Sequence, residues 1–134
     1  MAEYISNAAQ TVAVNGFVTF PAGNGCCCER PPHRAGSGLF TLRGGRKYRV
    51  YFSANVSAAV VGASTLAITT NGEAMPGAEM IATSAAAGDL NNVSAAVEIC
   101  VPKCCCYQVG VKNIGAQDAT VQNANIIIDV EGCR

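Results

Sequence analysis

Hydrophobic residues recur at every second position along much of this chain, and this alternation constrains the fold more than any other feature. Over residues 47–56 it places Tyr48, Val50 and Phe52 on one side and Lys47 and Arg49 on the other. A period of two is typical of a β-strand with one buried face. Turn signals such as Asn-Gly and Gly-Gly separate the alternating stretches at about the 8–12-residue spacing of sandwiches and barrels.

These stretches predict an all-β fold, an antiparallel β-sandwich of the jelly-roll type with about 8–9 strands. The expected strands lie in residues 11–20, with a turn at Asn15-Gly16, and in residues 39–42, 47–56, 65–69, 75–82, 93–101, 107–111 and 120–130. No segment of useful length has a helical period, although the Ala-rich residues 82–87 are expected to form one helical turn. Because 134 residues fit one domain, we expect an N-terminal arm in residues 1–10 and a single jelly-roll domain in residues 11–134.

The low charge content predicts that part of the folded chain's surface is covered by other copies of the same chain. Only 13% of the residues are charged, against about 25% in an ordinary soluble domain. The alternation directs Ile127 outward, and Val60 and Val61 lie in a small, apolar stretch without aromatic bulk. We therefore expect a homo-oligomer, with Val60, Val61 and Ile127 as interface candidates.

Charge and polarity also exclude several classes of partner. The net charge is zero, so the basic stripe that nucleic-acid binding needs is missing. The uncharged residues 50–72 contain too many Ser, Thr and Asn side chains for a membrane span, which predicts no membrane insertion. The first residues lack a basic n-region and an apolar h-region, so we expect synthesis in the cytoplasm without a signal peptide.

Eight cysteines make up the second strong feature, and they are candidates for disulfides or cross-links: Cys26, Cys27, Cys28, Cys100, Cys104, Cys105, Cys106 and Cys133. Neighbouring residues on a strand point to opposite faces, so three contiguous thiols cannot all meet one partner. Glycines and prolines around both triple runs place them on loops at an end of the sandwich. Disulfides, some between subunits, reduced thiols that pack as small hydrophobes, and a metal site all stay open.

The sequence predicts no metal, no cofactor and no catalytic centre. Zinc sites use cysteine pairs spaced C-x₂₋₄-C, which contiguous triples match poorly. The one arrangement that resembles a metal site is His33, the only histidine, with Cys26 and Cys28. The carboxylates are scattered, and no nucleophile, base and orienting group can be assembled. We therefore expect a protein that is not an enzyme.

Four runs carry a family resemblance: HRAGSGLFTLRG at residues 33–44, GEAMPG at 72–77, VQNANIII at 121–128 and AQTV at 9–12. In this order they resemble small cysteine-rich proteins of Firmicutes and their bacteriophages. The strand layout is similar to the trimeric jelly rolls of the tumour necrosis factor and complement-head type, and to the C-terminal domains of collagen-like spore glycoproteins. The resemblance implies a homotrimer whose inner strands bury an apolar axis.

The resemblance favours a structural protein of a phage virion: a capsid decoration, head-fibre or fibre-tip subunit attached to capsid or tail proteins. A collagen-like Gly-X-Y stalk is missing from the sequence, which points away from a long fibre shaft. On this hypothesis the protein reaches the virion or the extracellular surface after release, where its cysteines oxidise.

Two alternatives stay open. One is a cell- or spore-surface filament subunit with disulfide cross-links; endospore appendage subunits carry such cysteines on an N-terminal arm, whereas residues 1–10 contain none. The other is a module that binds a host-surface glycan or receptor, although sugar-stacking aromatics are few, with no Trp, four Tyr and four Phe.

Overall fold

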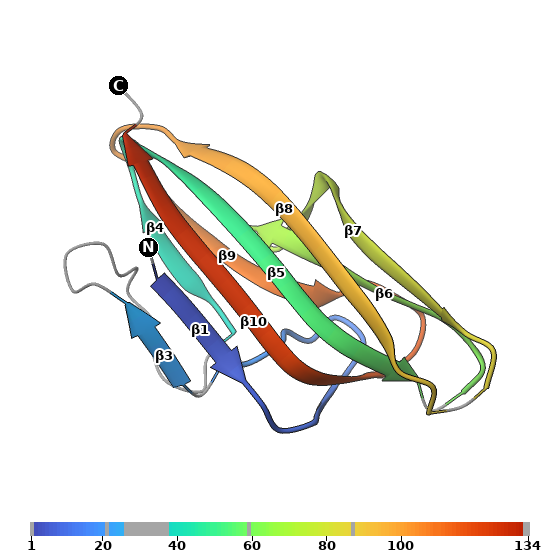
Figure 1. Cartoon of the computed structure of the whole chain (residues 1–134). Coiled ribbons are helices and arrows are strands. Elements are labelled where there is room, and N and C mark those ends of the chain that lie inside the picture. The colour runs from blue at the N-terminus through green and yellow to red at the C-terminus, as the bar shows by residue number, and fades with distance from the viewer. Residues whose placement is uncertain (1, 21, 26–37, 59, 87, 133–134) are drawn as a thin grey trace.

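Two packed antiparallel sheets make up the computed structural model, which describes residues 2–20, 22–25, 38–58, 60–86 and 88–132 (Figure 1). The six-stranded sheet has the order β3-β1-β10-β5-β8, with β2 also paired to β10, and the four-stranded sheet has the order β4-β9-β6-β7. The strands are β1 (Ala2–Ser6), β2 (Gln10–Val12), β3 (Ala22–Gly25), β4 (Phe40–Arg43), β5 (Arg46–Ala58), β6 (Gly62–Thr70), β7 (Glu73–Ser84), β8 (Asn91–Val101), β9 (Cys106–Asn113) and β10 (Ala119–Gly132). The predicted all-β jelly-roll sandwich is confirmed.

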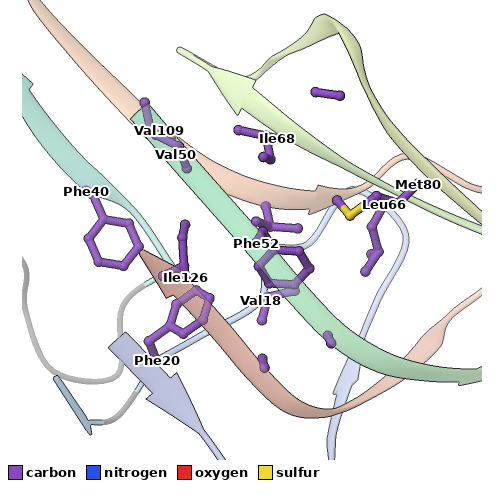
Figure 2. Close-up of a cluster of buried hydrophobic side chains, with 14 of the residues drawn as sticks. Val18, Phe20, Phe40, Val50, Phe52, Leu66, Ile68, Met80, Val109 and Ile126 are labelled. Atoms are coloured by element: carbon purple, nitrogen blue, oxygen red, sulfur yellow. The ribbon is translucent and has the colours of Figure 1, made fainter. Parts of the chain in front are cut away.

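The alternation positions the core as the sequence predicts. Along β5 every even-numbered side chain from Tyr48 to Ala58 is buried, and the odd-numbered ones face away from the four-stranded sheet. Aromatic rings fill the centre between the sheets (Figure 2): the Phe20 ring centroid lies 5.6 Å from that of Phe40 and 6.4 Å from that of Phe52. Both pairs are tilted or edge-on, the arrangement that aromatic quadrupoles prefer.

The stretch expected as an N-terminal arm contains a strand of the six-stranded sheet. Residues of β1 pair with β10 on one side and β3 on the other. Tyr4 is fully buried, and its ring centroid lies 4.6 Å from that of Phe40. Burying an aromatic side chain is worth about 1.5–3 kcal/mol, which favours docking of this segment on the core.

Residues 11–20 contain the turn that the Asn15-Gly16 dipeptide predicts, but only part of the stretch forms a regular strand. Only β2 pairs regularly, and the Asn15-Gly16 turn then reverses the chain, with Asn15 at a φ of 66°. Beyond the turn the chain pairs briefly with β9 of the four-stranded sheet: the Val18 N–H donates to the Val111 carbonyl at 2.9 Å, and Phe17 forms an antiparallel bridge with Lys112. At Thr19 the Gln10 side chain takes the place of a ladder partner, since its amide donates to the Thr19 carbonyl and its oxygen accepts from the Thr19 N–H, both at 2.9 Å.

The helical turn expected at residues 82–87 is wrong for the described positions of that segment. Strand β7 continues to Ser84, because Ala82 pairs with Ser64 of β6 and turns its methyl group into the core. Among the described residues we find no helix long and apolar enough to span a membrane.

The sandwich has two distinct ends, which Figure 1 shows at opposite extremes of β5. The cysteine end holds the β4–β5 turn, the β8–β9 connection and the last residues of β10; Gly132 pairs with Arg46, which also pairs with Val101. The apolar end holds the β5–β6, β7–β8 and β9–β10 connections and the residues after β2. The 13 residues of β5 separate the two ends by about 40 Å.

Candidate functional site

The outer face of the six-stranded sheet carries a weakly polar band across its middle. Strand register places Ile127 opposite Tyr51, and Tyr51 opposite Ala96. Tyr51 is 42% exposed, and Ile127 is half-buried. Around them lies a shallow hollow of about 420 Å³. We call this surface the central band; its outward side chains are Tyr51, Ser53, Ser94, Ala96, Asn125 and Ile127.

Charged side chains lie next to the central band, on its cysteine-end side. The Glu98 carboxylate contacts the Lys47 ammonium at 2.9 Å and the Arg49 guanidinium at 3.2 Å. The hydrogen bond and charge of Lys47 lower the pKa of Glu98 below its ordinary value of 4.5. This side of the face therefore holds one carboxylate between two cations, and the six outward side chains of the central band are uncharged.

Three exposed, free thiols lie at the cysteine end: Cys104, Cys105 and Cys106. Cys104 adopts a φ of 65°, and the Cys105 N–H donates to the Pro102 carbonyl at 3.2 Å, so the run turns sharply before β9. The turn directs successive thiols into solvent, as expected for a loop. Within the described ranges no cluster of His, Cys, Asp and Glu is arranged to hold a metal ion.

The β4–β5 turn fits closely beneath this loop. A Cβ at Gly44 would overlap the backbone oxygens of Pro102 and Cys105. Tyr48 supports the same turn from inside, because its hydroxyl donates to the Arg43 carbonyl at 3.0 Å. Burial raises the pKa of Tyr48 above its ordinary value of 10.0, so the phenol keeps its proton and stays a donor at neutral pH.

The remaining cysteines are only partly described. Cys100 lies on the exposed outer face opposite Lys47, as the alternation predicts, and it is disulfide-bonded to a partner outside the described residues. The first triple run, the C-terminal cysteine and the metal candidate also lie outside the described residues: Cys26, Cys27, Cys28, Cys133 and His33. Disulfides between subunits stay a prediction.

The apolar end gathers exposed hydrophobic side chains from separate connections. Val60 and Val61, predicted as interface candidates, are 65% and 59% exposed. Leu90 is 57% exposed in the β7–β8 connection, which the Gly88 N–H ties to the Ala58 carbonyl at 2.9 Å. In the sequence Leu90 is a lone leucine in a polar turn, a pattern that does not by itself indicate an interaction site.

The three predicted interface residues do not form one surface. Ile127 lies in the central band, whereas Val60 and Val61 lie at the apolar end, beyond the seven residues of β5 that follow Tyr51. Tyr51 was missed as a site residue, although its odd-numbered position between Arg49 and Ser53 assigned it to the outer face. The structure therefore divides the candidates between a lateral face and an end.

Comparison with known proteins supports the fold. No protein-family model matches the chain, and no curated protein matches it. Among solved structures, the globular domain of zebrafish complement 1qA protein superposes with a TM-score of 0.67 at 14% identity, covering 94% of each chain. Eiger TNF from S. frugiperda gives a TM-score of 0.68 at 9% identity, covering 100% of this chain and 94% of its own. Murine APRIL gives 0.62 at 9% identity, covering 96% and 97%. The chain thus has the jelly-roll fold of complement-head and tumour necrosis factor domains.

Proposed function

We propose that this protein is a non-enzymatic structural subunit that assembles as a homotrimer through the central band and forms part of the surface of a phage virion. The observation that carries the proposal is the composition of that band. Tyr51, Ile127 and Ala96 form an uncharged row across three adjacent strands. Charged side chains lie elsewhere on the same face, among them Lys47, Arg49 and Glu98. An apolar centre with a polar rim is the usual anatomy of a protein–protein interface.

The surroundings of the band agree with an interface of this kind. On one side lies the Lys47–Glu98–Arg49 cluster, in which both cations contact the Glu98 carboxylate. On the other side Asn92 donates to Asn55 at 3.2 Å, an amide pair that can exchange partners without burying a charge. At the β1 edge of the band the Glu3 carboxylate lies opposite Ile127 and accepts from the Asn125 amide at 3.0 Å, so apposed copies would cover a carboxylate that already has a donor. Burying unpaired charge is the costly step in association. The number of copies, three, rests on the sequence resemblance.

Replacing Tyr51 by lysine tests the interface. Sedimentation equilibrium of the wild-type chain is expected to give the mass of three 13.7 kDa copies, and Tyr51→Lys is expected to give one. The matched control is Ile81→Lys, because Ile81 is a large hydrophobe that is 63% exposed on the outer face of the four-stranded sheet. A wild-type monomer at micromolar concentration, or equal effects of the two lysines, would contradict the interface.

The virion assignment has its own test. Mass spectrometry of purified phage particles from the source strain should detect this chain, and immunogold labelling should place it on capsid or tail. Detection only in free filaments would support the surface-filament alternative instead.

A glycan-binding module is the second candidate, favoured by one observation. The exposed Tyr51 ring lies beside the hydroxyls of Ser53 and Ser94 over the 420 Å³ hollow, a combination that suits a sugar face. A trimer through the same band would close this hollow. Binding of wild-type protein to a glycan array that Tyr51→Ala abolishes, together with a monomeric mass, would replace the trimer proposal by this one.

A further inference from the structure

The two ends of the sandwich differ in chemistry more than its faces do. Among the described residues, six large hydrophobic side chains are exposed, and four of them lie at the apolar end: Val14, Val60, Val61 and Leu90. They come from the residues after β2, the β5–β6 connection and the β7–β8 connection. Scattered exposed hydrophobes need no explanation, but a cluster at one end marks an interaction site.

Hydrogen bonds also anchor the connections at the apolar end. The Gly88 N–H bonds the Ala58 carbonyl at 2.9 Å, the Gln117 amide donates to the Ala63 carbonyl at 3.1 Å, and Asp118 accepts from the Val14 N–H at 3.3 Å. These bonds tie the β7–β8 connection to the end of β5, and the β9–β10 connection to β6 and to the segment after β2. A surface fixed in this way loses little conformational entropy on docking.

The charges of the two ends are opposite. In the described part of the apolar end the only charged side chains are the exposed carboxylates of Asp89 and Asp118. The cysteine end carries the exposed cations Arg43, Arg46 and Lys103, for which the described residues provide no ion pair. A copy that presents one end to the other end of its neighbour therefore brings opposite charges together, whereas two like ends repel.

The cysteine end also offers a matching apolar surface. Pro102 and the free thiols Cys104, Cys105 and Cys106 are all exposed there, and uncharged thiols pack as small hydrophobes. The cations surround this patch, as the carboxylates accompany the valines and leucine at the opposite end.

From these observations we infer that the apolar end of one copy docks on the cysteine end of the next, so that subunits stack head to tail along the strand direction. The occupant of the apolar end is thus a second copy of this chain. Contacts between different surfaces of identical subunits repeat, and they produce linear arrays when no rotation closes them. Stacking uses the ends and the trimer uses a lateral face, so this inference does not depend on the proposed trimer.

Site-directed cross-linking provides the first test. The Val61→Cys variant is treated with a short bis-maleimide, and the joined peptides are identified by mass spectrometry. The new thiol is expected to be linked to the 104–106 peptide. Because about 40 Å separates these positions within one chain, the link must join two copies. Ile81→Cys is the matched control, an equally exposed site on the outer face of the four-stranded sheet, three residues before the end of β7.

Any other dominant product overturns the inference. A link between two new thiols would mean that apolar ends meet each other, and a link between two 104–106 peptides would mean that cysteine ends meet. Equal yields from Val61→Cys and Ile81→Cys would show random collision. The same experiment in the Tyr51→Lys background distinguishes the two proposals, since stacking should survive the loss of the trimer.

Charge exchange provides the second test. Asp89→Lys with Asp118→Lys makes the apolar end basic, and Arg43→Glu with Lys103→Glu makes the cysteine end acidic. Each double variant alone is expected to self-associate about tenfold more weakly than wild type in sedimentation velocity, since two exposed attractions become repulsions. An equimolar mixture should recover association, because the basic apolar end meets the acidic cysteine end. No recovery, or no weakening in either double variant, would refute the charge pairing.

Discussion

Replacing Asn113 by alanine should destabilise the apolar end more than any other single polar substitution near it. Asn113 is fully buried at the end of β9. Its side-chain amide donates to the Val12 carbonyl at 3.0 Å and to the Gln117 carbonyl at 2.9 Å, and its oxygen accepts from the Gly115 N–H at 3.0 Å. One side chain therefore joins β2, β9 and the β9–β10 connection.

The magnitude follows from what the substitution leaves behind. Val12 is 2% exposed, so its carbonyl loses its partner away from water, and an unsatisfied buried group costs about 1–3 kcal/mol. Gly115 and Gln117 are half-buried, and water can partly replace the lost bonds there. Together with the lost packing, we expect the free energy of unfolding to fall by roughly 3 kcal/mol, a large share of the ~5–15 kcal/mol typical of a domain.

Urea unfolding at one fixed protein concentration measures the effect, since any assembly would make stability concentration-dependent. With an m-value of about 1–3 kcal/mol/M, the midpoint should fall by roughly 1 M or more. Asn92→Ala is the matched control: Asn92 is exposed and bonds only the Asn55 side chain in the described structure, so its loss should cost at most about 0.5 kcal/mol. Equal midpoints for the two variants would refute the reasoning.

Two further predictions concern the cysteine end and the charge cluster. Gly44→Ala should cost about 1–3 kcal/mol of stability and change the maleimide-labelling rate of Cys105, because the new methyl group must push the loop away; an unchanged rate and midpoint would contradict the close fit. An NMR titration should find the pKa of Glu98 below 4.5, and Lys47→Met should raise it. Since the lowered pKa favours the carboxylate in the folded state, the stability it adds is present above the ordinary pKa and is lost as the pH falls through the lowered value. The same titration midpoint in both proteins would contradict the assigned cause.

Much of the fold could be read from the sequence because strand burial has a period of two. The outward position of Ile127 and Cys100 and the buried stripe of β5 all follow from counting residues. The Pro76-Gly77 pair predicts a bulge or an edge position, and both are found: the β6–β7 register shifts opposite this pair, and β7 has only β6 beside it in its sheet. Proline lacks the N–H that a central strand must donate, so this inference needed no tertiary information.

Elements without a clear alternation were harder to predict. Strand β1 is too short to show a periodic pattern, and it is stabilised by pairing with β10, more than 100 residues later in the chain. The segment after Asn15 leaves the six-stranded sheet and pairs only briefly with β9, and a glutamine side chain replaces the ladder partner at Thr19. Contacts of this kind depend on which distant segments of the chain pair, and the local hydrophobic pattern does not specify that pairing.

The sequence by itself determined the strand class, the in-and-out assignment of most side chains and the low charge that points to assembly. Only the tertiary structure decided that Val14, Val60, Val61 and Leu90 share one end, and that the basic residues and the free thiols share the other. The physical reason is that antiparallel pairing reverses the chain at every connection. Residues far apart in sequence thereby meet at an end of the sandwich, and their common surface exists only once the strand order is fixed.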